Sequence, residues 1–170
     1  ERMFMRQNRD VVGRYVHYEF GAARREDEAI VVVPVYSEIE GGDENNGEGH
    51  TLIDQIVNLG EQDTDQFRAV FVVNNSQEEY ESNSGAYQDN QLAIRLLRAL
   101  GRVNSLEMNE ADAVGYLSEA FGRDIDMTTE QLEGMVFAAQ RLRFDYVDAS
   151  AENFMPQEVN GREVVPPGYA

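Results

Sequence analysis

The sequence predicts an α/β fold with a mainly parallel sheet flanked by helices, and three features of the chain support this. Two of them are continuous apolar, β-branched runs, "AIVVVPVY" at 29–36 and "RAVFVV" at 68–73. The third is an amphipathic helical pattern between them, at 52–59. A strand, a helix and a second apolar strand in this order indicate a parallel pair joined by a right-handed crossover. The 170 residues suit one domain, and two complete domains are not expected.

The first part of the chain holds a lead-in, a strand, a loop and a helix. The lead-in at 1–28 is mixed in charge and carries aromatic residues, and we expect it to pack on the domain without setting its architecture. The first strand is predicted to leave the sheet at Pro34, because proline donates no backbone N–H to a ladder. A polar, glycine-rich loop at 37–50 follows. The helix after it is capped by Thr51 and ends near Gly60.

The second apolar strand is followed by a long, mainly helical stretch. The acid-rich segment "SQEEYESNSG" at 76–85 is expected to be a mobile loop, with a flap over a bound ligand as the alternative. The next helical pattern runs through 88–103, with Asp89 or Asn90 as its cap. A helical insertion is predicted near 105–127, where "NEADAVGYLSEAF" has helical spacing.

The domain closes with a last helix and a third strand. Thr128 and Gln131 have the spacing of a capping box before an apolar helical face. The segment "RFDYVDAS" at 143–150 is predicted to return as a shorter, more polar strand, so that the α/β domain covers 29–150. The tail at 151–170 has no periodic pattern and is expected to be irregular.

Composition excludes several classes of function. The net charge is −18, which argues against a protein that binds the phosphate backbone of nucleic acids. The chain has no cysteine, so disulfides, thiolate metal sites and thiol nucleophiles are excluded. No apolar run approaches the roughly 18 to 20 residues of a membrane-spanning helix, and the sequence predicts a cytoplasmic protein without a membrane span.

Polar residues follow the two apolar strands at the point where each strand ends. The first strand leads into "YSE" at 36–38, and the second leads into "NNS" at 74–76. In an open α/β sheet, ligands bind at the carboxyl ends of the strands. Short polar side chains and backbone amides at such an edge can hydrogen-bond a nucleobase and a ribose. We therefore expect a binding crevice at this edge.

At these positions the sequence resembles the nucleotide-sugar-binding half of inverting glycosyltransferases of the large family-2 type, which have a GT-A fold. The similarity covers roughly 29–100, with a weaker extension to "FDYVDAS". It is carried by four segments: "IVVVPVYSE", "TLIDQIVNL", "AVFVVNNS" and "YQDNQLAIRLL".

The resemblance implies a Rossmann-like, GT-A-like sheet that is incomplete in this chain, and an enzyme that transfers a sugar from a nucleotide diphosphate donor to an acceptor hydroxyl. It also implies nucleotide-binding roles for five residues: Pro34, Tyr36, Glu38, Asn74 and Ser76. The family commonly has aspartate at the end of the second strand. An asparagine there still accepts a hydrogen bond but adds no charge.

The same resemblance implies a divalent metal, Mn²⁺ or Mg²⁺, held by an Asp-x-Asp motif. The usual segment with this motif is not found before Ala170. Asp145 and Asp148 of "DYVD" offer spaced carboxylates near the end of the third strand and are weak candidates for metal ligands. The "DID" motif at 124–126 has the right letters, but it precedes a capped helix and is expected to be a solvated loop. A catalytic base is not identified.

A second hypothesis belongs to another class of protein. The same sheet without metal ligands would serve as a non-catalytic α/β binding or interaction module. The two hypotheses share the strand-end edge and differ in whether a nucleotide binds there.

Overall fold

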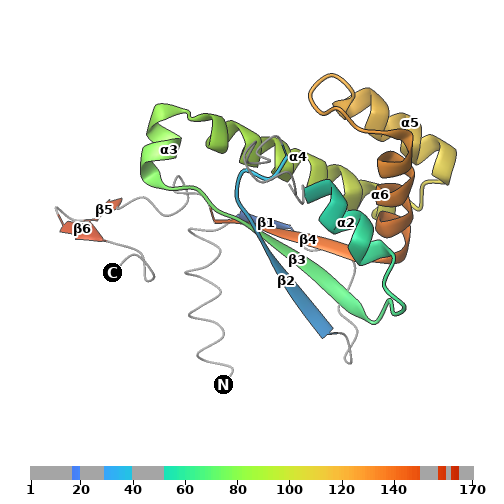
Figure 1. The fold of residues 1–170 in the computed structure, drawn as a ribbon. Coiled ribbons are helices and arrows are strands. Elements are labelled where there is room, and N and C mark those ends of the chain that lie inside the picture. Colours follow the sequence, from blue (N-terminus) through green and yellow to red (C-terminus); the bar gives the residue numbers. More distant parts are fainter. Residues whose placement is uncertain (1–16, 20–28, 40–51, 150–156, 160–161, 165–170) are drawn as a thin grey trace, which may run out of the picture.

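The computed structural model describes residues 17–19, 29–39, 52–149, 157–159 and 162–164, and these form an α/β structure (Figure 1). Its elements in chain order are β1 (His17–Glu19), β2 (Ala29–Val35), α2 (Leu52–Gly60), β3 (Phe67–Val73), α3 (Gln77–Ser82), α4 (Gly85–Ser105), α5 (Glu110–Phe121), α6 (Thr129–Arg141), β4 (Arg143–Asp148), β5 (Gln157–Val159) and β6 (Arg162–Val164). No helix in these ranges is long and apolar enough to cross a membrane.

The main sheet has the strand order β1-β4-β3-β2. Strands β2, β3 and β4 are parallel to one another, which confirms the predicted parallel pair and the third strand. Strand β1 pairs antiparallel with β4 at the far edge. The lead-in therefore extends the sheet, which its sequence did not indicate.

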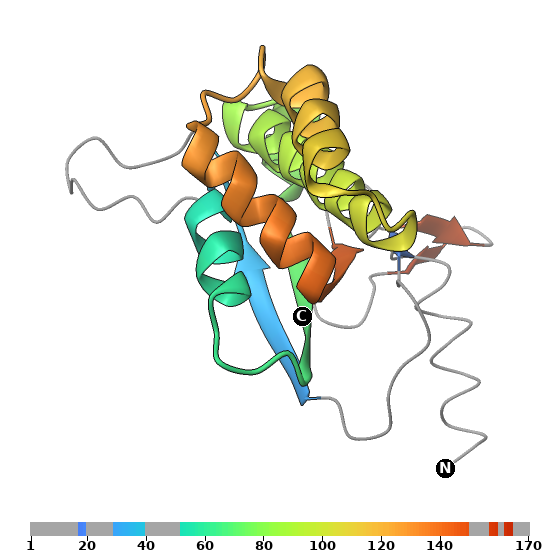
Figure 2. The same ribbon diagram turned by 90° about the vertical axis from the view of Figure 1, so that its right-hand side faces the viewer.

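The helices of the described part cover one face of this sheet, as Figures 1 and 2 show together. This follows from the topology, because β2, β3 and β4 lie side by side in chain order and right-handed crossovers that advance in one direction stay on one face. Among the described parallel strands the order never reverses. A crevice at their carboxyl ends must therefore be built by the loops, because the usual reversal point is missing.

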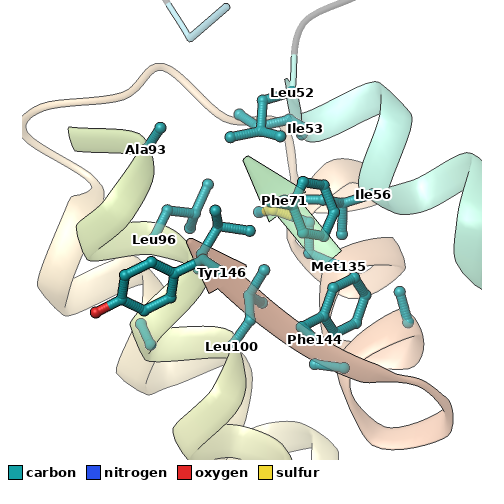
Figure 3. Packing of buried hydrophobic residues seen from close by; sticks show 14 of the residues in the cluster. Leu52, Ile53, Ile56, Phe71, Ala93, Leu96, Leu100, Met135, Phe144 and Tyr146 are labelled. Atoms are coloured by element: carbon teal, nitrogen blue, oxygen red, sulfur yellow. The ribbon is translucent and has the colours of Figure 1, made fainter. Parts of the chain in front are cut away.

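The hydrophobic core lies between the sheet and this helical layer (Figure 3). Phe71 on β3 and Phe144 on β4 stack with ring centroids 5.8 Å apart. Side chains of three helices close over them, and several have no exposed area, among them Leu52, Ile56, Leu96, Leu100 and Met135. The hydroxyl of Tyr146 points away from the cluster and accepts a hydrogen bond of 2.7 Å from Arg98.

The continuous apolar run of β2 is typical of a strand that is covered on both faces, and the position of β2 in the structure is different. It lies at the edge of the described sheet, and Ile30 and Val32 are 50% and 61% exposed. These two residues project from the face opposite the described helices, since strand residues alternate between faces and Val33 and Val35 pack toward the core.

Pro34 lies inside β2 and does not end it. The backbone N–H of Ala29 and the carbonyl of Val35 both bond toward β3. Because the direction of these groups alternates along a strand, the nitrogen of Pro34 points to the open edge, where no ladder bond is lost. An edge strand is the place in a sheet that tolerates proline.

The stretch at 76–85 is also different from its prediction. It forms the short helix α3, which begins with a capping box between Ser76 and Glu79. Helix α4 begins at Gly85 with Ser84 as its cap, so Asp89 and Asn90 lie inside the helix and are buried.

The remaining helices agree with their predictions. Helix α5 is capped by Asn109, and α6 begins with the predicted capping box of Thr128 and Gln131. Helix α2 ends at Gly60 as expected, while the predicted cap Thr51 lies outside the described residues. The tail holds the antiparallel pair β5–β6, where no regular structure was predicted.

Candidate functional site at the carboxyl ends of β2 and β3

The loops that follow β2 and β3 are joined by one side chain from the first half of α4. The amide of Asn90 accepts a hydrogen bond of 2.7 Å from the backbone N–H of Ser37 through its oxygen. Through its nitrogen it donates one of 2.9 Å to the carbonyl of Asn74. Asn90 is fully buried, so both bonds are protected from water. The two strand ends are thereby held at a fixed separation.

Asp89, the residue before Asn90, anchors the loop after β2 at a second position. A carboxylate oxygen of Asp89 accepts a hydrogen bond of 3.0 Å from the backbone N–H of Ile39. Ser37, between the two anchors, has a φ of 50°, a left-handed conformation that costs energy for a residue with a side chain. Such strain persists only where the surroundings enforce it, and it is concentrated at functional sites.

Tyr36 and Ser76 meet through a carboxylate of α3. The hydroxyl of Tyr36 donates a hydrogen bond to Glu79, whose other oxygen accepts one of 2.8 Å from the backbone N–H of Ser76. These bonds to the ionised form lower the pKa of Glu79, the bond from Tyr36 being the largest cause. The bond to Glu79 is also the main reason that the pKa of Tyr36 is raised. The tyrosine ring is 54% exposed and borders the edge.

Glu38 lies on the α2 side of the same loop. Its carboxylate accepts a hydrogen bond of 2.8 Å from the amide of Gln55. Partial burial raises the pKa of Glu38, the bond from Gln55 opposes this, and the nearby carboxylate of Asp89 adds to the rise. Glu38 can accept hydrogen bonds from the hydroxyls of a ligand.

The side chain of Asn75 is the most unusual group at this edge. Asn75 is 1% exposed, and neither its amide oxygen nor its amide nitrogen has a hydrogen-bond partner among the residues that the structure describes. Buried polar side chains nearly always have one, because an unsatisfied group loses its bonds to water without replacement. An amide carries donors and an acceptor side by side, which is also the pattern on the edge of a nucleobase.

The structure brings the predicted nucleotide-binding residues to one edge in different ways. Tyr36 and Ser76 share Glu79, and Asn74 is tied to the first loop by Asn90 through its backbone, while its side chain is exposed. Pro34 contributes backbone geometry only. The sequence predicted Asp89 or Asn90 as a helix cap, so their role in anchoring the loops was missed. Two adjacent polar residues inside a helical pattern are the signal that could have revealed this role.

The two metal candidates do not come together. Asp145 and Asp148 are three residues apart on β4, so they project from opposite faces of the sheet. Asp145 is fully buried and lies 3.0 Å from Arg68 in an ion pair on the face opposite the described helices. A carboxylate engaged by a guanidinium in this way is a poor ligand for Mn²⁺ or Mg²⁺. Within the described ranges no three His, Asp or Glu side chains are grouped so that they could hold a metal ion.

Comparison with known proteins gives no match for this chain: no family model fits its sequence, no curated protein matches it, and no solved structure matches it. The geometry therefore identifies only the class of protein: an α/β domain in which the loops after β2 and β3 form a polar edge. The glycosyltransferase resemblance stays a prediction from the sequence.

Proposed function

We propose that this edge binds the nucleoside part of a nucleotide diphosphate sugar, as the donor-binding half of a glycosyltransferase does. The observation that carries the proposal is the amide of Asn75, which is buried without a partner in the described ranges, beside two loops that Asn90 holds in place. Polar groups that are held in fixed positions, one of them without a hydrogen bond, suit the binding of a ligand with complementary hydrogen-bonding groups.

Each group at the edge suits one part of a nucleoside. The amide of Asn75 has the donors and the acceptor that a base requires, and a base contacts it when binding uncovers this side chain, which is 1% exposed. The exposed ring of Tyr36 offers a surface on which a base can stack. The carboxylate of Glu38 can accept the hydroxyl protons of a ribose. Transfer of the sugar to an acceptor hydroxyl belongs to the same proposal, but the metal candidates do not fit a shared ion and no catalytic step is assigned to them.

The experiment compares Asn75→Leu with the unchanged chain in calorimetric titrations with uridine diphosphate and guanosine diphosphate. Leucine has the same branching and the same number of side-chain heavy atoms and removes an unsatisfied amide, so stability is expected to stay the same or rise slightly. Binding of the preferred nucleotide is expected to fall about tenfold or more, which corresponds to roughly 1.4 kcal/mol.

The matched variant is Asn90→Leu, which removes an amide whose bonds are made. It leaves the N–H of Ser37 and the carbonyl of Asn74 unpaired and is expected to lower the free energy of unfolding by about 1 to 3 kcal/mol. If no nucleotide binds at millimolar concentration, or if Asn75→Leu binds as well as the unchanged chain, the proposal is wrong.

The exposed edge strand favours the second candidate, a non-catalytic interaction module. β2 carries no charge, and the backbone N–H groups of Ile30 and Val32 point to the open edge, as the bonding of Ala29 and Val35 requires. Uncharged edges of this kind can accept a further strand from another chain. Loss of nucleotide binding in every titration would favour this candidate.

A further inference from the structure

A polar cavity of about 580 Å³ lies beside the strand-end edge, between the first half of α4 and the loop that follows α5. Its walls include Asp89, Gln91 and Arg95 of α4, and Arg123 and Asp124 of the loop. Asp89 also anchors the β2 loop through Ile39, so the cavity and the proposed nucleoside site share a wall.

The acidic and basic groups of this cavity differ in what they already contact. Asp124 accepts a hydrogen bond of 3.1 Å from Arg95, and Asp89 accepts one from Ile39. In contrast, Arg123 makes no ion pair or hydrogen bond in the described part of the chain, and the buried Nε2 of Gln91 has no partner. Arg123 and Gln91 therefore offer hydrogen-bond donors to a ligand.

One of the two arginines is also positioned before any ligand arrives. The guanidinium of Arg95 lies over the ring of Phe121, 5.6 Å from its centroid, and pairs with Asp124 of the loop. These contacts hold Arg95 beside the loop that carries Arg123. A chain with a net charge of −18 repels anions in general, whereas in this cavity two arginines balance the two aspartates, which makes it a local exception.

We propose that this cavity binds the phosphate groups of a nucleoside diphosphate through Arg123, Arg95 and the amide of Gln91. The inference rests on the proposed function for the identity of the ligand, and it adds a mode of phosphate recognition by arginine that needs no metal ligand. Guanidinium groups form charge-assisted, often paired hydrogen bonds with phosphate oxygens.

The test titrates the whole chain with inorganic pyrophosphate in a phosphate-free buffer, using calorimetry. Arg123→Gln is expected to weaken binding about tenfold, the loss of one charge-assisted contact. Asp124→Asn is expected to strengthen binding, because it releases Arg95 from a competing carboxylate. Arg102→Gln is the matched control: it removes an exposed arginine in the last turn of α4, outside this cavity, and should leave binding unchanged.

Absence of pyrophosphate binding at millimolar concentration would overturn the inference, as would equal binding by Arg123→Gln and the unchanged chain. Melting temperatures of all variants show whether the fold is intact. Uridine and guanosine, titrated in parallel, separate the two proposals. If pyrophosphate binds and neither nucleoside does, the anion cavity stands and the nucleoside site fails, and the reverse result retains the nucleoside site alone.

Discussion

At the scale of single residues, Asn75 and Asn90 show how one residue type serves two purposes. Both amides are buried, yet Asn90 bonds to both strand-end loops, and Asn75 makes no hydrogen bond through its side chain within the described part of the chain. A fully used amide stabilises the loops, whereas an unused one costs stability and is retained for a ligand under the proposal above. The sequence shows two asparagines and cannot show which of them has partners.

The contributions of Glu38 and Glu79 to the stability of the protein should change with pH in opposite directions. The folded-state pKa of Glu38 is raised, mainly by burial, so its contribution to stability is fully present below the ordinary value of 4.5 and is lost as pH rises through the folded-state pKa. Glu38→Gln should therefore change the free energy of unfolding more favourably at pH 7 than at pH 4. Urea unfolding at the two pH values measures this difference.

Glu79 is the internal control for that experiment, because its folded-state pKa is lowered by the bonds from Tyr36 and Ser76. Its contribution to stability is present above the ordinary value of 4.5 and is lost as pH falls through the folded-state pKa. Glu79→Gln should destabilise the protein at pH 7 and have a smaller effect at low pH. Equal responses of the two variants would show that the environments of these carboxylates are misassigned.

At the scale of elements, the contact between α2 and α6 depends on a glycine at the end of α2. A Cβ added at Gly60 would lie 2.6 Å from the Cβ of Ala138, closer than real side chains approach. The carbonyl of Gly60 also accepts a hydrogen bond of 2.9 Å from Arg141, which ties the two helix ends together. The residue thus ends a helix and admits a close neighbour.

We expect Gly60→Ala to lower the free energy of unfolding by about 1 to 3 kcal/mol, the usual cost of overpacking. Gly101→Ala is the matched control, because it lies within α4 and a Cβ there meets nothing within 4 Å. It should stabilise the protein by about 0.5 to 1 kcal/mol, since alanine restricts the unfolded chain. Thermal unfolding of both variants measures the effects, and a change of the same sign in both would contradict this packing.

Strong local patterns predicted most of the elements. The capping box of Thr128 and Gln131 and the two apolar strands are examples, because these signals depend on nearby residues. Errors arose where the pattern was ambiguous. Glycine, serine and three acidic residues suggested a loop at 76–85, but a capping box at Ser76 was enough for a short helix.

At the scale of the whole molecule, the sheet is covered by described helices on one face and open at β2. The apolar composition of β2 could not reveal its edge position, because burial depends on which strands lie next to it. The meeting of the two strand-end loops was predictable from parallel pairing. The anchoring by Asn90 and the cavity at Arg123 were not, because both join segments distant in sequence.

The exposure of β2 leads to a stability prediction. Val32→Lys should change the free energy of unfolding by less than about 1 kcal/mol, because Val32 is 61% exposed and surface substitutions have small effects. Val73→Lys in β3 should unfold the protein, since it buries an unpaired charge at a site with no exposed area. Circular dichroism melting of both variants compares them. A strong loss of stability in Val32→Lys would mean that this strand is covered.

The central claim is that the edge formed by the β2 and β3 loops is a nucleoside site, and a crystal structure of the chain soaked with uridine diphosphate tests it most directly. We predict electron density for the base within hydrogen-bond distance of the amide of Asn75, with the phosphates directed toward Arg123. Density for the nucleotide at a different surface, with the amide of Asn75 still unpartnered, would contradict the claim.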